Sequence, residues 1–163
     1  MKRLATIFIL VVFSSTLHAQ SIENLSPETA SRVYTEVAGE LQVCSAYFQL
    51  ASECMNNTRA GAGDKMKQLS DRTLENAAVI LLMSSTLTLG IKGQEYDQAK
   101  LWDKTQVSAF RNYESAYNAM ISEMMTCQNL SILSTKHLDP CVSHYDNPDA
   151  LVNSWVKKLS TEE

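Results

Sequence analysis

The chain of 163 residues is acidic, with 18 Asp and Glu against 14 Lys and Arg and a formal net charge of −4. This balance argues against binding to nucleic acid or to an anionic lipid surface, because Lys and Arg hold both partners through their phosphate groups. The chain contains five Gly and three Pro. All-β domains need turn residues at short intervals, so this composition favours a few long helices.

The N-terminus has the pattern of a signal peptide. Lys2 and Arg3 precede an apolar run over 4–13, and a small residue, Ala19, offers a cleavage site. The run of about ten residues is half the length needed to span a bilayer, so no stable membrane anchor is expected. Removal of residues 1–19 leaves 12 basic against 18 acidic residues, a net charge of −6. We therefore expect an exported protein, periplasmic or secreted.

A first helix is predicted over 27–57. Ser26 provides an N-cap hydroxyl, Pro27 suits the first helical position, and Glu28 faces the positive end of the helix dipole. Apolar residues then recur at alternating steps of three and four, which is typical of one buried helix face. They are Val33, Val37, Leu41, Cys44, Phe48, Ala51 and Met55.

A second helix is predicted over 64–89. Its segment 77–83 is apolar on every side, which is typical of a helix enclosed by other helices. Hydroxyl residues from Ser84 onward interrupt the run and Gly90 ends it, so the segment is interpreted as too short and too polar to cross a membrane. We expect this helix to be the central element, shielded by the others.

A third helix is predicted over 95–133. At 1.5 Å per residue it would reach about 57 Å, so a kink or an overhanging end is expected. A loop containing Pro140 is predicted over 134–146, and a short last helix over 148–160, capped by Asn147. The apolar stripe of the third helix contains Ala99, Trp102, Phe110, Tyr113, Tyr117, Met120, Met124 and Cys127.

These segments predict an all-α fold. Residues 20–163 are expected to form a single four-helix bundle-like domain with a short C-terminal helix. A domain of this length can bury a substantial apolar core. The sequence contains no internal repeat and no low-complexity stretch that would indicate a second unit.

Four cysteines in an exported domain predict two disulfides. Cys44 and Cys54 lie on one predicted helix about 15 Å apart, whereas a disulfide needs Cα atoms within about 7 Å. Both bridges must then join the first helix to the last third of the chain. An up-down-up path brings Cys54 level with Cys127, and the following loop can carry Cys141 back to Cys44. We therefore favour Cys54–Cys127 with Cys44–Cys141 over the crossed alternative.

Several short stretches resemble a set of small exported helical proteins of bacteria. They are the run 44–48 (Cys-Ser-Ala-Tyr-Phe), the run 129–133 (Asn-Leu-Ser-Ile-Leu), and then Cys141, Pro148 and Trp155. The resemblance implies a helical fold and agrees with a Cys44–Cys141 bridge. It implies no activity, cofactor or partner.

One candidate catalytic residue is Glu114. The stretch 114–118 (Glu-Ser-Ala-Tyr-Asn) resembles the Glu-Ser motif of lytic transglycosylases and goose-type lysozymes. That resemblance implies a general acid acting on peptidoglycan. The Gly-Leu-Met-Gln-type segment that follows in those families is absent. Helical periodicity places Glu114 on the flank of the buried stripe, so we expect a solvated helix residue and no enzyme.

Two clusters could suggest a metal site. In the first, a loop cluster, Cys141 cannot be a thiolate ligand once it is oxidised to a disulfide. In the second, a methionine cluster, the residues recur at the spacing of a buried helix face and are expected to pack in the core. We therefore expect no metal and no cofactor. The loop cluster is His137, Asp139, Cys141, His144 and Asp146, and the methionine cluster is Met120, Met124, Met125 and Cys127.

The leading hypothesis is a non-enzymatic protein-binding or accessory module in the periplasm or the secreted space. It follows from a disulfide-stapled bundle without a convergent polar site. The alternative is a carrier of a small apolar ligand, and the remote alternative is a peptidoglycan-cleaving enzyme using Glu114. The predicted partner is another protein, and the oligomeric state stays open. The interhelical cavity of the carrier hypothesis would be lined by Trp102, Phe110, Tyr113, Tyr117 and Trp155.

Overall fold

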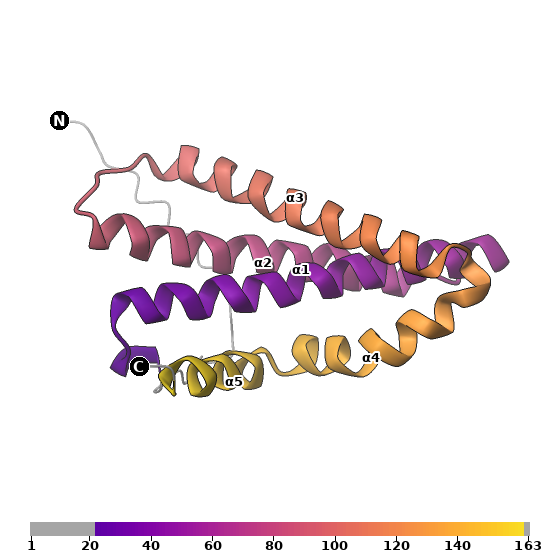
Figure 1. Cartoon of the computed structure of the whole chain (residues 1–163). Coiled ribbons are helices and arrows are strands. Elements are labelled where there is room, and N and C mark those ends of the chain that lie inside the picture. The colour runs from indigo at the N-terminus through magenta and orange to yellow at the C-terminus, as the bar shows by residue number, and fades with distance from the viewer. Residues whose placement is uncertain (1–21, 162–163) are drawn as a thin grey trace.

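The computed structural model describes residues 22–161 (Figure 1). Within this range all regular structure is helical, and five α-helices are present where four were predicted. The predicted signal peptide, residues 1–19, lies outside the described residues. The elements are η1 (Ile22–Asn24), α1 (Pro27–Thr58), α2 (Asp64–Ile91), α3 (Gln98–Met124), η2 (Cys127–Asn129), α4 (Leu130–Asp146) and α5 (Pro148–Ser160), where η denotes a 3₁₀ helix.

The central element is α1. It contacts α2, α3, α4 and α5, and in Figure 1 it lies between the α2–α3 pair and the α4–α5 pair. Residues 44–48 of α1 are all buried, so this helix is covered on every side over more than one turn. The prediction that the 64–89 helix would be the central one is wrong, because α1 is the helix with neighbours on every side.

Two apolar clusters form the core, and both are built on α1. The first joins the C-terminal half of α1 to α3 and α4, and it includes Phe48 and Leu133. The second joins the N-terminal half of α1 to α2 and α5, and it includes Val37 and Val152. The short helix α5 therefore contributes to the core by covering the part of α1 that α4 does not reach.

Small hydroxyl residues lie between α1 and α2. Ser45 Oγ donates to the Ser70 carbonyl and Ser70 Oγ donates to the Ser45 carbonyl, each at 2.9 Å. Ser31 Oγ lies 2.9 Å from both Ser84 Oγ and Thr88 Oγ1. These hydroxyls satisfy one another across the interface, so the two helices pack closely with buried polar groups that keep hydrogen-bond partners.

The predicted helix over 95–133 is wrong, because the chain reverses after α3. Met125 has a φ of 60°, a left-handed value that is rare for a residue with a side chain. The Asn129 side chain donates to the Met124 carbonyl at 3.0 Å and supports the turn. Cys127 follows directly and is bonded to Cys54 on α1. Neither Gly nor Pro lies at this break, so the helical periodicity of the apolar residues continues through it and does not indicate the turn.

The predicted loop over 134–146 is also wrong, because these residues belong to α4. Pro140 lies inside the helix. Proline has no N–H, so the Lys136 carbonyl loses its intrahelical donor at this point. The buried side chain of Leu133 and the bonded, buried Cys141 hold the two halves of α4 against the core. Tertiary contacts therefore outweigh the helix-breaking tendency of the proline.

The two disulfides join the pairs of cysteines that the helix geometry predicts. Cys44 is bonded to Cys141 with their Cα atoms 5.1 Å apart, and Cys54 is bonded to Cys127 with their Cα atoms 5.2 Å apart. Both bridges tether α1 to segments that follow α3. All four cysteines of the chain are used.

The apolar second half of α2 is only partly covered. By length and composition alone, α2 is the one helix among the described residues that could cross a membrane, and 17% of its most apolar window is buried. The interpretation of this segment as too short and too polar is therefore not supported. Ala77 and Ser84 face α1 and are buried, whereas Met83 is exposed. The face of α2 that does not contact α1 is covered in part by α3.

The turn between α1 and α2 gives a stability prediction. A Cβ at Gly63 would lie 2.1 Å from the Ser52 carbonyl oxygen, so Gly63→Ala should push the helices apart and destabilise the protein by about 1–3 kcal/mol. At Gly39, inside α1, nothing lies within 4 Å of an added Cβ. Gly39→Ala is the matched control and should be neutral or stabilising by up to about 1 kcal/mol. Chemical unfolding of both variants measures the difference; equal effects would contradict the close approach.

Candidate functional site

A groove of about 690 Å³ lies between α2 and α3. We call it the α2–α3 groove. Its floor is apolar and its rim is polar. The floor consists of Leu74, Ala78, Trp102, Val107, Ala109 and Phe110, and the rim of Asp71, Glu75, Gln106, Arg111 and Glu114.

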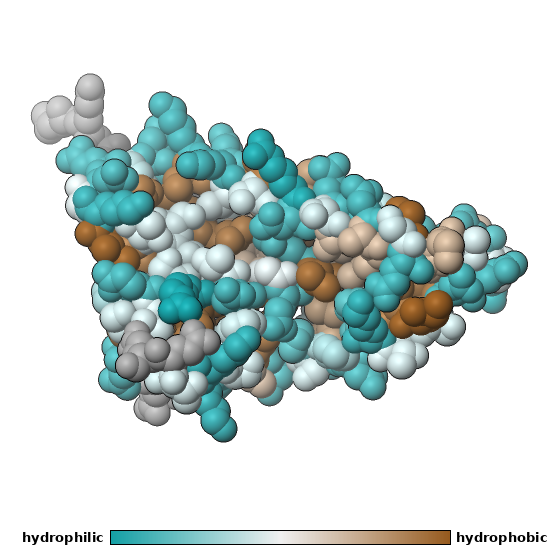
Figure 2. Space-filling view, viewed as in Figure 1, coloured by the Kyte–Doolittle hydropathy of each residue, from teal (hydrophilic) through white to brown (hydrophobic). Residues whose placement is uncertain are grey.

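The floor of the α2–α3 groove is open to solvent. Val107 is 52% exposed and Phe110 is 51% exposed, whereas Ala109 between them is buried against the rest of the protein. In Figure 2, apolar surface is visible among polar residues over the region of α2 and α3. Scattered apolar surface residues are normal, but two neighbouring half-exposed apolar side chains in one groove make it a candidate interaction site.

The rim carries more negative than positive charge. Asp71 is paired with Lys67 one turn earlier on α2. Glu75 and Glu114 have no ion-pair partner among the described residues, and Arg111 is the one basic residue of the rim. The groove therefore combines an apolar floor with two carboxylates that can pair with charges from outside the protein.

Two tyrosines of α3 lie near the groove, and the charges of Asp71 and Glu114 act on one of them, Tyr113. Tyr113 and Tyr117 stack with ring centroids 6.0 Å apart, and Tyr117 donates a short hydrogen bond to Glu53 on α1. Burial, together with the nearby carboxylates of Glu53, Asp71 and Glu114, raises the pKa of Tyr113 to about 12. Burial and the hydrogen bond to Glu53 raise the pKa of Tyr117 as well.

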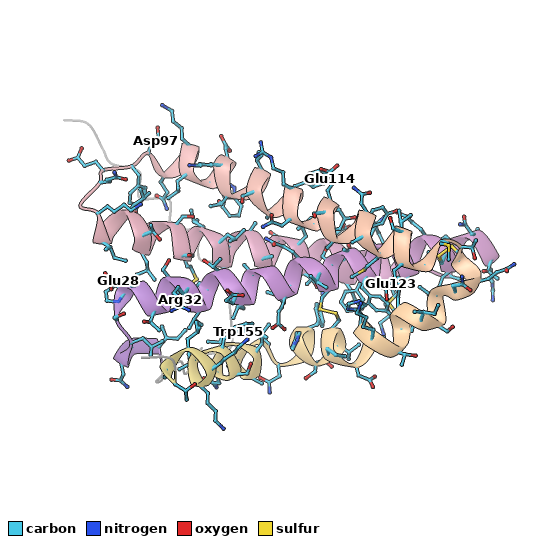
Figure 3. All side chains as sticks on the ribbon, viewed as in Figure 1. Glu28, Arg32, Asp97, Glu114, Glu123 and Trp155 are labelled. Carbon is cyan, nitrogen blue, oxygen red and sulfur yellow. A yellow bond between two sulfur atoms is a disulfide. The ribbon has the colours of Figure 1, made fainter. Side chains whose placement is uncertain are left out.

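The predicted cavity lined by five aromatic residues is wrong. Trp102 and Phe110 line the α2–α3 groove, but Tyr113 and Tyr117 pack against the first core cluster instead. Trp155 belongs to α5, on the other side of α1 from Glu114 (Figure 3). Its Nε1 donates to Glu40 at 2.8 Å. The prediction failed because a shared helix face and an apolar character do not determine which other helices each side chain contacts.

A second, smaller hollow of about 240 Å³ lies between α1 and α4. His144 pairs there with Glu40 at 2.9 Å, and the His137 ring lies 5.9 Å from the ring of Tyr47. Burial lowers the pKa of His137. This hollow holds the histidines of the candidate loop cluster, but Cys141 is in a disulfide and Asp139 is exposed.

Neither candidate metal cluster is assembled. In residues 22–161, no group of three or more His, Cys, Asp or Glu side chains is placed to hold a metal ion. Met120 and Met124 are buried in the first core cluster, whereas Met125 is 77% exposed at the turn after α3. Cys127 is in a disulfide. The methionine cluster is therefore divided between the core and the surface.

The candidate catalytic residue Glu114 is exposed on the rim of the α2–α3 groove. A general acid that cleaves a glycosidic bond works from an apolar, partly enclosed environment beside a second carboxylate. Glu114 instead lies on the solvent-exposed rim of the groove. Glu114 therefore lacks the enclosed surroundings of such a general acid.

No protein-family model, curated protein or solved structure is significantly similar to the chain.

The ionisation of Tyr113 at high pH tests whether its ring is buried beside the carboxylates of the groove. The pKa of Tyr113 is raised from 10.0 to about 12, so the folded protein keeps a phenol proton that the unfolded chain releases. Stability is then fully present below about pH 10 and is lost as the pH rises through about 12. Unfolding curves across this range, with tyrosinate absorbance, measure the loss. Tyr113→Phe should make it smaller; an identical curve for this variant would contradict the assignment.

Proposed function

We propose that the protein is an exported, non-enzymatic module that binds another protein through the α2–α3 groove. The observation that carries the proposal is the half-exposed pair Val107 and Phe110, held on a rigid helix above a buried Ala109. Such side chains are anchors of the kind that dominate protein interfaces when a partner covers them. The proposed scaffold is four-helix bundle-like, with α4 and α5 together in the fourth position.

Export is supported by the use of the cysteines. The chain has four cysteines and all of them lie in the two disulfides. Disulfides of this kind form and persist in oxidising compartments outside the cytoplasm. The signal-peptide pattern of residues 1–19 agrees with that location.

A protein partner suits the shape of the groove better than a small ligand. Small-molecule pockets enclose most of their ligand, whereas Val107 and Phe110 on the floor of this groove are half exposed. From Trp102 to Glu114 the lining extends over twelve residues of α3, about 18 Å along the helix axis. That length matches about three turns of a partner helix.

The test is a capture experiment with surface variants. Phe110→Asp places a charge on the floor, and Ile132→Asp is the matched control because Ile132 on α4 is exposed to the same degree. We expect a stoichiometric partner from the exported protein fraction of the source to be retained by the unaltered protein and by Ile132→Asp, and lost by Phe110→Asp. A monomer that retains no partner, or equal loss with both variants, would count against the proposal.

The alternative, a carrier of a small apolar ligand, has one observation in its favour. The groove volume of about 690 Å³ is in the range of pockets that hold drug-sized molecules. Native mass spectrometry of protein purified from its source separates the two functions. A retained small molecule that Phe110→Asp releases would favour the carrier.

A further inference from the structure

We propose that the partner segment is a cationic amphipathic helix, seated in the α2–α3 groove with basic residues beside Glu75 and Glu114. This inference rests on the proposed function and names the chemistry of its partner. It follows from the order of apolar and acidic side chains along the groove.

The groove has an apolar end and an acidic end. α2 and α3 run antiparallel in Figure 1, so Asp71 at the start of α2 lies near Glu114 late in α3. The charges of both carboxylates act on Tyr113, which places them at the same end. Trp102 lies twelve residues before Glu114 and marks the opposite, apolar end.

This polarity matches a helix whose apolar face carries three or four anchors. Side chains at i, i+3 or i+4 and i+7 of a partner helix recur over one face and would follow the floor from Trp102 toward Phe110. Lys or Arg on the flank of that face would then reach Glu75 and Glu114, which have no ion-pair partner among the described residues. The rim carries three carboxylates against the one basic residue Arg111, so charge complementarity favours a basic partner.

Other occupants fit less well. A second copy of this chain would bring its own acidic rim, and the exported chain is expected to carry a net charge of −6. An anionic lipid surface would meet the same repulsion. A small cation would leave the apolar floor uncovered.

The experiment measures the binding of three fluorescent peptides, each of about 15 residues, by anisotropy. The first is a Leu/Lys amphipathic helix, the second its Leu/Glu counterpart with the same apolar face, and the third a scrambled Leu/Lys sequence. We expect the Leu/Lys helix to bind at micromolar concentration and to weaken with added salt, because the rim carboxylates are exposed. The other two peptides should bind at least tenfold more weakly.

Variants of the protein locate the site. The double variant Glu75→Gln/Glu114→Gln should weaken the Leu/Lys helix about three- to tenfold, which is the range for two exposed charge pairs. Glu95→Gln/Asp139→Asn is the matched control, because it removes the same charge from exposed positions outside the groove and should bind unchanged. Phe110→Asp should abolish binding.

The outcomes separate the inference from the function on which it rests. Equal binding of the Leu/Glu helix, still lost in Phe110→Asp, would overturn the cationic partner and leave a protein-binding groove. Binding that ignores both Phe110→Asp and the double variant would overturn the inference, as would no binding at all. The last measurement uses zwitterionic lipid vesicles in place of the peptides. If the protein binds the vesicles but none of the peptides, and Phe110→Asp loses this binding, the inferred helical partner would be overturned in favour of a membrane surface.

Discussion

Replacing Phe48 with alanine should lower the free energy of unfolding by about 3–5 kcal/mol. Phe48 is fully buried in the first core cluster on α1, with its ring centroid 5.6 Å from that of Tyr47. Truncation removes the transfer free energy of the ring and leaves a cavity in the first core cluster, which also contains the bonded Cys44 and Cys54. Urea unfolding of the oxidised protein, followed by circular dichroism, measures the change.

The matched control is Phe110→Ala. This ring is half exposed in the α2–α3 groove, so its removal should change the stability by less than about 1 kcal/mol. The same two variants thus separate a residue that holds the fold from one available for binding. A large loss of stability for Phe110→Ala would contradict the view that its ring is free to contact a partner.

Removing both disulfides together should destabilise the protein by about 8 kcal/mol, whereas removing either one should cost about 3–4 kcal/mol. The bridges are nested, since Cys54–Cys127 lies within the chain closed by Cys44–Cys141. With one bridge in place, the other closes an effective loop that is much shorter than its own sequence separation. Loop-closure entropy depends on that effective length, so each bridge partly replaces the other.

Three variants test this nesting: Cys44→Ala/Cys141→Ala, Cys54→Ala/Cys127→Ala, and the protein without any of the four cysteines. The loss for the last should exceed the sum of the first two. Since typical domains are stable by about 5–15 kcal/mol, the variant without bridges should be close to unfolding. Simple additivity would contradict the chain-entropy account.

The starts of α1 and α5 could be predicted because their chemistry is local. Ser26 Oγ accepts from the Thr29 N–H at 3.1 Å and Pro27 is the first residue of α1. Asn147 Oδ1 accepts from the Ala150 N–H at 3.1 Å at the start of α5. The same local geometry excluded a bridge between Cys44 and Cys54, which lie ten positions apart on one helix, and the expected up-down-up path of the helices then favoured the observed pairing.

The end of α3 and the extent of α4 could not be predicted from local signals. Met125 takes a left-handed conformation that nothing in its own side chain favours, and Pro140 stays within a helix that it would ordinarily end. In both places a contact with α1, remote in sequence, decides the backbone. The Cys54–Cys127 bridge lies beside the first, and the Cys44–Cys141 bridge lies beside the second.

The candidate site was predicted in part. Periodicity placed Trp102 and Phe110 on one stripe of a helix, and they do line one groove. It placed Tyr117 on the same stripe, but Tyr117 turns to Glu53 on α1. An apolar pattern identifies the face of a helix that prefers cover, whereas the number and arrangement of the other helices decide which part of it is left open.

The placement of the cysteines also determines how the protein responds to a protease. The connection over 92–97, between α2 and α3, is fully exposed, and Cys44 and Cys54 precede it while Cys127 and Cys141 follow it. A single cut there would give two fragments that stay joined by two covalent bonds. A gel should show one band without reductant and two with it. The helices that form the groove come from different fragments, so the nicked protein should keep its binding surface.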